Sequence, residues 1–181
     1  MGENTMILRS EEVEKEALLT VAKLMCAAAR TAPKGRGVDS METLILLDGE
    51  EKAKVIAELH RLAGETGGAL FARDAGNLEK AGAAVLLGTR VQPLGIPGCG
   101  YCGLGGCENT IKAGGVCTYN TVNLGIAIGS AVSVASAHKI DNRVMFTLGR
   151  AALNVGLFKT DVKQAFGIPL YVGAKSPFFD R

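Results

Sequence analysis

Four of the five cysteines of this chain lie within nineteen consecutive positions, at Cys99, Cys102, Cys107 and Cys117. Their spacing is C-x2-C-x4-C-x9-C. Four thiolates complete the tetrahedral shell of a zinc ion or fill the four ligand positions of a small iron–sulfur cluster. The short spacing between Cys99 and Cys102 allows two sulfurs of one tight turn to face the same metal. We therefore interpret the four cysteines as ligands of one metal centre.

The segment that carries these cysteines is rich in glycine. Eight glycines and two prolines fall between Gln92 and Cys117, a composition typical of loops. Glycine permits positive-φ turns that aim backbone N–H groups at a bound sulfur. The glycines expected to do so are Gly100, Gly103, Gly105 and Gly106. The sequence thus predicts a cysteine-rich, metal-binding insertion at about residues 92–118.

An iron–sulfur cluster and a zinc ion are the competing occupants. Structural zinc sites usually combine one CxxC pair with a second pair or with histidine, but His60 and His138 both fall in predicted helices. This favours an iron–sulfur cluster, and zinc in a structural or interaction module remains the alternative. A further alternative is that the cysteines are incidental. The fifth cysteine, Cys26, is expected to be a small residue of the hydrophobic core.

A second group of candidate binding residues follows the first predicted helix. Arg30, Lys34 and Arg36 place three cations on or beside a short loop, where they are able to bind a phosphate or the edge of a flavin. The alternative is that they complement the negative end of the helix dipole and stay solvated. No paired carboxylates and no nucleophile–base spacing identify a catalytic residue.

Composition narrows the class of protein. The 181 residues are 48% hydrophobic and 21% charged, with a formal net charge of +2 and no tryptophan. This balance does not indicate a nucleic-acid partner. The N-terminus lacks the basic and apolar regions of a secretory signal, and the apolar stretch over 124–137 is judged too short to span a membrane. Cysteines clustered in this way indicate metal binding or catalysis in a cytoplasmic protein.

Hydrophobic periodicity predicts helices and short strands in irregular order. Helices are expected from Ser10 to Pro33 and over 50–63, 119–138 and 151–157; strands are expected over 41–47, 83–88, 144–148 and 170–173. Residues 74–77 are expected to form a turn with a helix N-cap. Together these elements predict one α+β domain over residues 1–181, with a mixed sheet flanked by helices.

Three motifs carry a resemblance to a known family: CGYCG from Cys99, NLGIAIGSAV from Asn123 and DNRVMFTLG from Asp141. In this order they resemble a family of small prokaryotic proteins described as uncharacterised proteins containing a ferredoxin domain. The resemblance extends over the whole chain. The family has no settled activity, so the resemblance itself implies no reaction, and a redox partner protein is expected only from the predicted electron transfer.

The chain is also similar, more distantly, to the flavin-dependent nitroreductase superfamily. The similarity is carried by AAARTAPKGRG, ETLILLDGEEKAKVIAEL, NLGIAIGSAVSVASA and IPLYVGAKSPF. It implies a nitroreductase-like fold, a homodimer and an FMN at the subunit interface. Of the superfamily's N-terminal arginines only Arg9 is present, Asn123 replaces an acid, and Lys34 and Arg36 take the place of flavin-contacting residues.

The resemblances and the cysteines together predict a redox protein that transfers electrons through an iron–sulfur cluster, with an FMN as a second cofactor. Lys34 and Arg36 are its predicted cofactor-binding residues. The alternatives are a zinc-stabilised module without catalysis and a flavin-dependent reductase whose cysteines are incidental.

Overall fold

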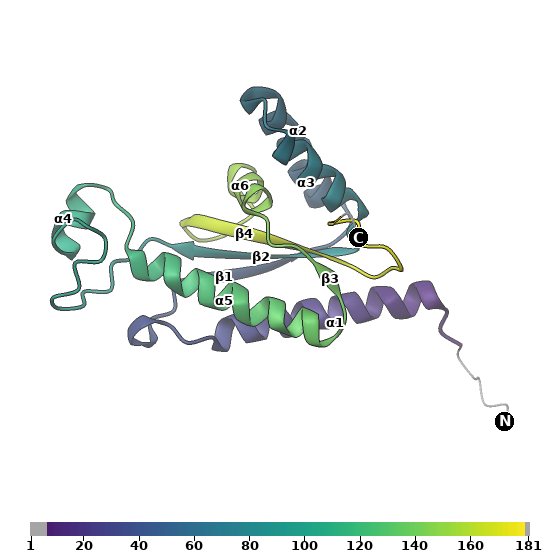
Figure 1. Cartoon of the computed structure of the whole chain (residues 1–181), viewed down its shortest axis with the longest axis horizontal. Helices are drawn as coiled ribbons and strands as arrows, with labels where there is room; N and C mark the ends of the chain where they lie inside the picture. Colours follow the sequence, from purple (N-terminus) through teal and green to yellow (C-terminus); the bar gives the residue numbers. More distant parts are fainter. Residues whose placement is uncertain (1–6, 180–181) are drawn as a thin grey trace.

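The computed structural model describes residues 7–179 and is built around a four-stranded sheet (Figure 1). The strands are β1 (Met41–Leu46), β2 (Ala83–Arg90), β3 (Asp141–Asn142) and β4 (Val162–Tyr171). Their order across the sheet is β1-β2-β4-β3, and each neighbouring pair is antiparallel. The predicted α+β class is confirmed, although within the described residues the sheet is antiparallel throughout and not mixed.

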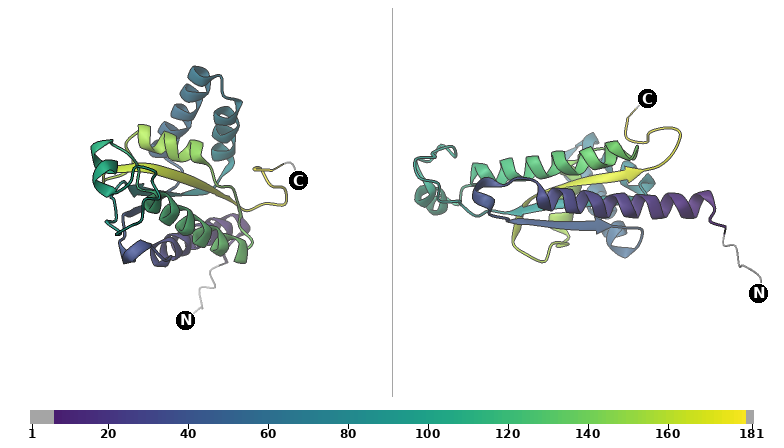
Figure 2. Two further views of the ribbon diagram at one scale, coloured as in Figure 1. Left: turned by 60° about the vertical axis from the view of Figure 1, so that its left-hand side comes forward. Right: turned by 90° about the horizontal axis from the view of Figure 1, so that it is seen from below.

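Helices cover both faces of the sheet (Figure 2). On one face α1 (Ser10–Thr31) and α5 (Thr118–Ala137) lie side by side. On the other face are α2 (Glu50–Thr66), α3 (Ala69–Lys80) and α6 (Phe146–Asn154). The sheet is therefore the middle layer of three.

The connection from β1 to β2 explains why these two strands are antiparallel. The sequence predicts one helix between these strands, and one crossover helix would make them parallel. The structure has two, because the chain turns at Gly67 and Gly68 and begins a second helix, α3, at Ala69. Because the chain passes through two helices and not one, β2 runs in the direction opposite to β1. The predicted turn over 74–77 is wrong, since Asp74 and Asn77 lie inside α3 and are buried.

Two further predicted elements differ from the structure. Residues 144–148, predicted as a strand, include the start of α6 at Phe146. The last strand begins at Val162, eight residues before its predicted start, and ends at Tyr171. The apolar run over 144–148 is too short for its periodicity to distinguish a strand from a buried helix. The early part of β4 was missed because Gly167 and Pro169 are residues that strands usually avoid.

The strand β2 is buried on both faces. Seven of its eight residues are buried, with only Arg90 partly exposed. Because side chains alternate along a strand, Val85 and Leu87 join the cluster under α1 and α5, while Ala84 and Leu86 join the cluster under the other helices. The apolar run AAVLLG is therefore a central strand that both hydrophobic cores share.

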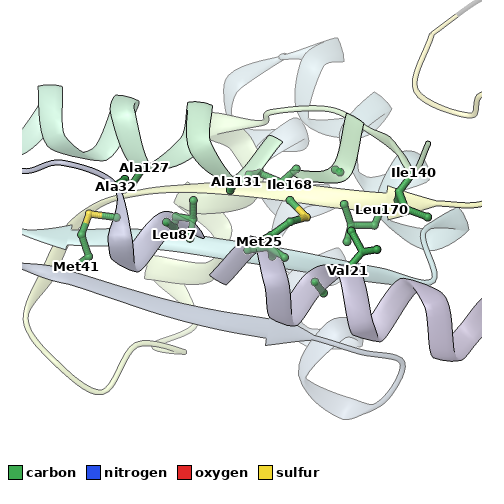
Figure 3. Close-up of a cluster of buried hydrophobic side chains, with 14 of the residues drawn as sticks. Val21, Met25, Ala32, Met41, Leu87, Ala127, Ala131, Ile140, Ile168 and Leu170 are labelled. Carbon is green, nitrogen blue, oxygen red and sulfur yellow. The ribbon is translucent and has the colours of Figure 1, made fainter. Parts of the chain in front are cut away.

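The cluster under α1 and α5 is the more extensive one (Figure 3). Met25 from α1 and Leu124 from α5 are almost completely buried there, as are Leu87 and Ile168 from the sheet. Cys26 packs against the edge of this cluster, and burial raises the pKa of its thiol. Cys26 is thus a partly buried residue that packs against the core, and not a residue of its centre.

On the other face, α6 approaches β4 so closely that only glycine fits at the contact. A Cβ added to Gly149 would lie 1.9 Å from the carbonyl oxygen of Ala165. A Cβ on Gly167 would lie 2.2 Å from Cγ of Leu148. The first contact is with backbone, which cannot move aside as a flexible side chain does.

We predict that Gly149→Ala destabilises the fold by about 1–3 kcal/mol, the usual cost of overpacking a core. The matched control is Gly64→Ala on α2, where an added Cβ meets nothing within 4 Å. That control should stabilise the helix by about 0.5–1 kcal/mol. Urea unfolding at pH 7 measures both free energies, and equal values for the two variants would contradict the packing argument.

A polar contact joins α2 to α6 on the same side of the molecule. Glu58 accepts hydrogen bonds from Arg61 at 2.6 and 2.8 Å and from Nδ2 of Asn154 at 2.6 Å. The hydrogen bonds from Arg61, aided by Asn154 and by the charge of Arg150, lower the pKa of Glu58 from 4.5 to about 2. The ionised carboxylate therefore stabilises the fold.

Because the pKa of Glu58 is lower in the folded chain, its contribution is complete above the unfolded pKa and is lost as the pH falls through the folded one. We predict that Glu58→Gln is about 1 kcal/mol less stable than the unsubstituted chain at pH 7, after allowance for solvent screening. The difference should shrink as the pH falls from about 4.5 towards 2. Urea unfolding of both proteins at pH 7, 4 and 3 tests this, and a difference that is independent of pH would refute it.

Candidate metal centre

The segment between β2 and α5 forms a lobe beyond one end of the sheet (Figure 1, left). β2 ends at Arg90 and α5 begins at Thr118; residues 91–117, here called the cysteine lobe, lie between them. The short helix α4 (Cys107–Lys112) belongs to this lobe. It is the segment in which the sequence predicts a metal-binding insertion.

All four cysteines of the lobe line one pocket of about 150 Å³. Cys99 and Cys102 lie in two consecutive turns, Cys107 is the first residue of α4, and Cys117 is the buried N-cap residue of α5. The other residues that line the pocket are Pro93, Ile96, Gly98, Gly100, Gly105, Gly106, Thr110, Thr118 and Tyr119. Segments separated by up to eighteen positions thus bring their thiols to the same cavity.

The turns of the lobe depend on glycine at defined positions. Gly100, Gly103 and Gly105 have φ values of +60°, +77° and +74°, in the left-handed region that other residues rarely adopt. Gly103 donates its N–H to the carbonyl of Gly100 at 3.0 Å, which closes the turn around Cys102. Gly106, also expected to turn, is extended.

Cys102 lies against polar groups of the lobe. Its Sγ lies 2.9 Å from the hydroxyl of Thr110. The Thr110 hydroxyl, followed by the backbone N–H groups of Leu104 and other lobe residues, lowers the pKa of Cys102. Donors aimed at a sulfur stabilise its thiolate, which is the form that binds metals.

The four thiols share a pocket without forming a closed ligand cage. Within residues 7–179, no three histidine, cysteine, aspartate or glutamate side chains are close enough to hold a metal ion. The structure thus brings the predicted ligands to one cavity without gathering three of them around one point.

Two asparagines at the start of α5 bind the base of the lobe and the loop that follows α1. Oδ1 of Asn120 accepts the backbone N–H of Gln92 at 2.9 Å, and Oδ1 of Asn123 accepts that of Gly35 at 3.0 Å. Both asparagines are buried, and the Nδ2 atom of each has no partner within the described part of the chain. One turn of α5 therefore holds two loops that are far apart in sequence.

Lys34 and Arg36 also engage backbone carbonyls. Nζ of Lys34 donates to three carbonyl oxygens at the end of α1, at distances from 2.7 to 3.1 Å. Arg36, in the 3-10 turn Gly35–Gly37, has a φ of +56° and donates to the carbonyl of Leu94 at 2.7 Å. Lys34 thus caps α1, and Arg36 ties the loop after α1 to the base of the lobe.

Sequence reasoning missed the structural role of Asn120, Asn123 and Thr110. A signal for the asparagines was present, because they are three residues apart on the apolar face of α5 that also carries Leu124 and Ala127. A buried amide on such a face normally has a hydrogen-bond partner. Nothing in the sequence indicated that Thr110 lies against Cys102, since their contact depends on the fold of the lobe.

Comparison with solved structures defines the fold. The chain has the nitroreductase fold. It is similar to a nitroreductase with bound FMN from Desulfitobacterium hafniense, with a TM-score of 0.58 and 16% identity over 96% of this chain and 82% of that one. It is also similar to a putative nitroreductase in complex with FMN from Desulfovibrio desulfuricans, with a TM-score of 0.57 and 11% identity over 98% and 82% of the two chains.

Comparison of sequences defines the family. A protein of Archaeoglobus fulgidus described as "Uncharacterized protein" is 36% identical over 184 residues, covering 97% of this chain and 98% of the relative. Residues 113–181 match the model of the family "Uncharacterized protein containing a ferredoxin domain (DUF2148)". The chain belongs to this family, as the resemblance predicted.

The long helix α5 requires one correction. It has 20 residues, Thr118–Ala137, and by length and composition alone it could cross a membrane, so the judgement that this apolar stretch is too short was wrong. Helix α5 packs against α1 and β2, and its residues Leu124, Ala127, Ala131 and Ala135 are buried in the core. One face of α5 is therefore part of the hydrophobic core.

We predict that Asn120→Leu destabilises the fold by about 1–3 kcal/mol, because the part-buried hydrogen bond from the backbone N–H of Gln92 loses its acceptor. The control is Thr121→Val, which removes an exposed hydrogen bond of 2.9 Å to Gln164 and should cost less than about 0.5 kcal/mol. Urea unfolding measures both. A cost for Asn120→Leu no larger than that of the control would show that this amide does not hold the lobe.

Proposed function

We propose that this chain is a redox protein that holds an iron–sulfur cluster on Cys99, Cys102, Cys107 and Cys117. The observation that carries the proposal is the single pocket into which all four cysteines are placed. Membership of a family described by a ferredoxin domain, together with a fold shared with flavin-dependent oxidoreductases, supports redox chemistry over a structural role.

The residues of the pocket suit such a group. Every metal-binding side chain that lines it is a thiol, and soft thiolates favour iron–sulfur clusters or zinc over magnesium or calcium. A cavity of about 150 Å³ holds a molecule of the size of benzene. There is thus room for a group of several atoms, whereas the thiolates around one zinc would have to approach to about 3.8 Å from each other.

The residues around the pocket would influence the reduction potential of a bound cluster. A bound cluster would supply reversible one-electron transfer. The Thr110 hydroxyl and the amides near Cys102 would donate to sulfur, and such hydrogen bonds help to set the potential of a cluster. Pro93, Ile96 and Tyr119 provide apolar walls that keep water away. Tyr119 is itself held by stacking on Tyr101, with ring centroids 6.1 Å apart.

FMN is the second candidate cofactor, because two solved structures with this fold are described with FMN bound. Lys34 and Arg36 remain the residues to test. Both donate to backbone carbonyls, so a flavin phosphate would have to replace those bonds.

We further propose that the protein works in the cytoplasm, as a homodimer that exchanges electrons with a partner protein. Exposed apolar side chains on α1 and α5, among them Leu24, Val122 and Ile126, give these two helices a surface suited to a second subunit. Thiols that must stay reduced to bind metal suit the reducing cytoplasm.

The decisive experiment is purification without oxygen, followed by analysis of iron, sulfide, zinc and flavin and by visible absorption. We expect iron and acid-labile sulfide in similar amounts, with a broad absorption that bleaches on reduction by dithionite. Cys99→Ala and Cys107→Ala should each lower the iron content about tenfold or more, since even outer residues of metal sites change affinity by this factor.

The matched control is Cys26→Ala, which removes a thiol outside the lobe and should leave the iron content unchanged. A colourless protein without iron after anaerobic reconstitution would end the cluster proposal. One zinc per chain would establish the structural module instead. Bound flavin without iron, lost on Lys34→Ala or Arg36→Ala, would establish the flavin reductase.

A further inference from the structure

A second pocket lies at the other end of the sheet from the cysteine lobe. It is an open cavity of about 670 Å³ between α3, the residue that follows β3, the end of β4 and the C-terminal segment 172–179. In Figure 1 the C-terminus marks this end and α4 the opposite one. The two pockets share no lining residue, and the volume is in the range of small-molecule sites.

The charge of this pocket is of one sign. Four cations line it, Arg73, Lys80, Arg143 and Lys175, and no acidic side chain does. The chain as a whole has a formal net charge of only +2, so the positive charge is concentrated in this pocket. Within residues 7–179, Lys80 and Lys175 form no ion pair. Like charges gathered around a cavity repel each other unless an anion lies between them.

The guanidinium groups are held in place by the fold. Arg73 pairs with Asp74 at 2.7 Å, and Asp74 is itself buried and accepts the hydroxyl of Thr147 at 2.5 Å. Arg143 donates to the carbonyl of Phe178 at 2.6 Å and lies over the ring of Phe179. Phe178 is buried in the core beneath α3 and α6, so the C-terminal wall of the pocket is anchored.

The second observation is a buried donor without an acceptor. Asn77 lines the pocket and is 6% exposed, and its Nδ2 has no hydrogen-bond partner within the described residues. Asn77 is four residues after Arg73 and three before Lys80, so the three side chains share one face of α3. A buried amide donor among cations is the arrangement that an anionic acceptor would complete.

Polar and aromatic groups complete the lining. Oγ of Ser176 accepts the backbone N–H of Phe178 at 3.2 Å, which leaves its hydroxyl proton for a ligand. Tyr171 and Phe178 pack edge to face, with ring centroids 6.4 Å apart, and both line the cavity with Phe179. Rings beside cations suit a molecule that combines phosphate with a planar ring.

We propose that this pocket is a binding site for a phosphate-bearing small molecule, held by Arg73, Lys80, Arg143 and Lys175 with Asn77 as a buried donor. Guanidinium and ammonium groups bind phosphate oxygens through charge-assisted hydrogen bonds. The site is separate from the cysteine lobe, so it stands whether or not a cluster binds there.

Calorimetric titration of the full chain with pyrophosphate and with ADP tests the proposal. We expect both probes to bind. Lys80→Gln with Lys175→Gln should weaken binding about tenfold or more, the effect of removing charged hydrogen-bond donors. Asn77→Asp, nearly isosteric, should abolish binding because it places an anion against the ligand. Tighter binding of ADP would identify a nucleotide, and equal binding a ligand recognised by its phosphates alone.

The control is Lys23→Gln with Lys159→Gln, which removes the same charge from two exposed lysines elsewhere and should leave both affinities unchanged. Circular dichroism and metal content verify that each variant folds. Absence of binding by either probe at millimolar concentration would overturn the proposal. Equal weakening by the control pair, or full binding by Asn77→Asp, would also overturn it.

Discussion

The burial of one strand on both of its faces is the constraint on which this structure depends. β2 lies between β1 and β4, and its side chains point alternately into the two hydrophobic cores. Neither layer of helices can separate from the sheet without exposing β2. The strand also fixes where the chain leaves the body, because the cysteine lobe begins one residue after Arg90.

The lobe owes its position to the body more than to its own contacts. Asn120 and Asn123 project from a helix whose apolar face lies in the core, and through them α5 holds both the entry to the lobe and the loop after α1. Arg36 joins these two loops directly, in a backbone conformation that is costly for a residue other than glycine. Local strain of this kind persists only where the surrounding structure enforces it.

The sequence was most informative where one physical signal dominated. The buried strand at 83–88 and the helices at 50–63 and 119–138 were predicted because their apolar patterns are long or continuous. The four cysteines were assigned to one site by spacing, and the structure places them around one pocket. Helix α3 was missed because Gly67 and Gly68 were taken as the beginning of a longer loop.

Other features depended on contacts between distant residues and had no local signal. Lys34 was expected to bind a cofactor. Its hydrogen bonds to the last carbonyl groups of α1 depend on where the chain turns after Pro33, and the path of this turn was not visible in the sequence. The cationic pocket near the C-terminus combines α3 with residues about a hundred positions later. Charge clusters of this kind exist only once the sheet has formed, so composition and spacing could not reveal them.

The anchoring of the lobe at its base bears on how the protein would survive oxidative damage. Both hydrophobic cores are assembled mainly from the sheet and from helices α1, α2, α3, α5 and α6, and neither includes any of the four thiols of the lobe. Loss of a metal centre would therefore leave the scaffold folded, with the four sulfurs still tethered to a rigid frame. A centre of the proposed kind would then be reloaded in place, because reloading would require ordering of a short glycine-rich segment and not refolding of the whole chain.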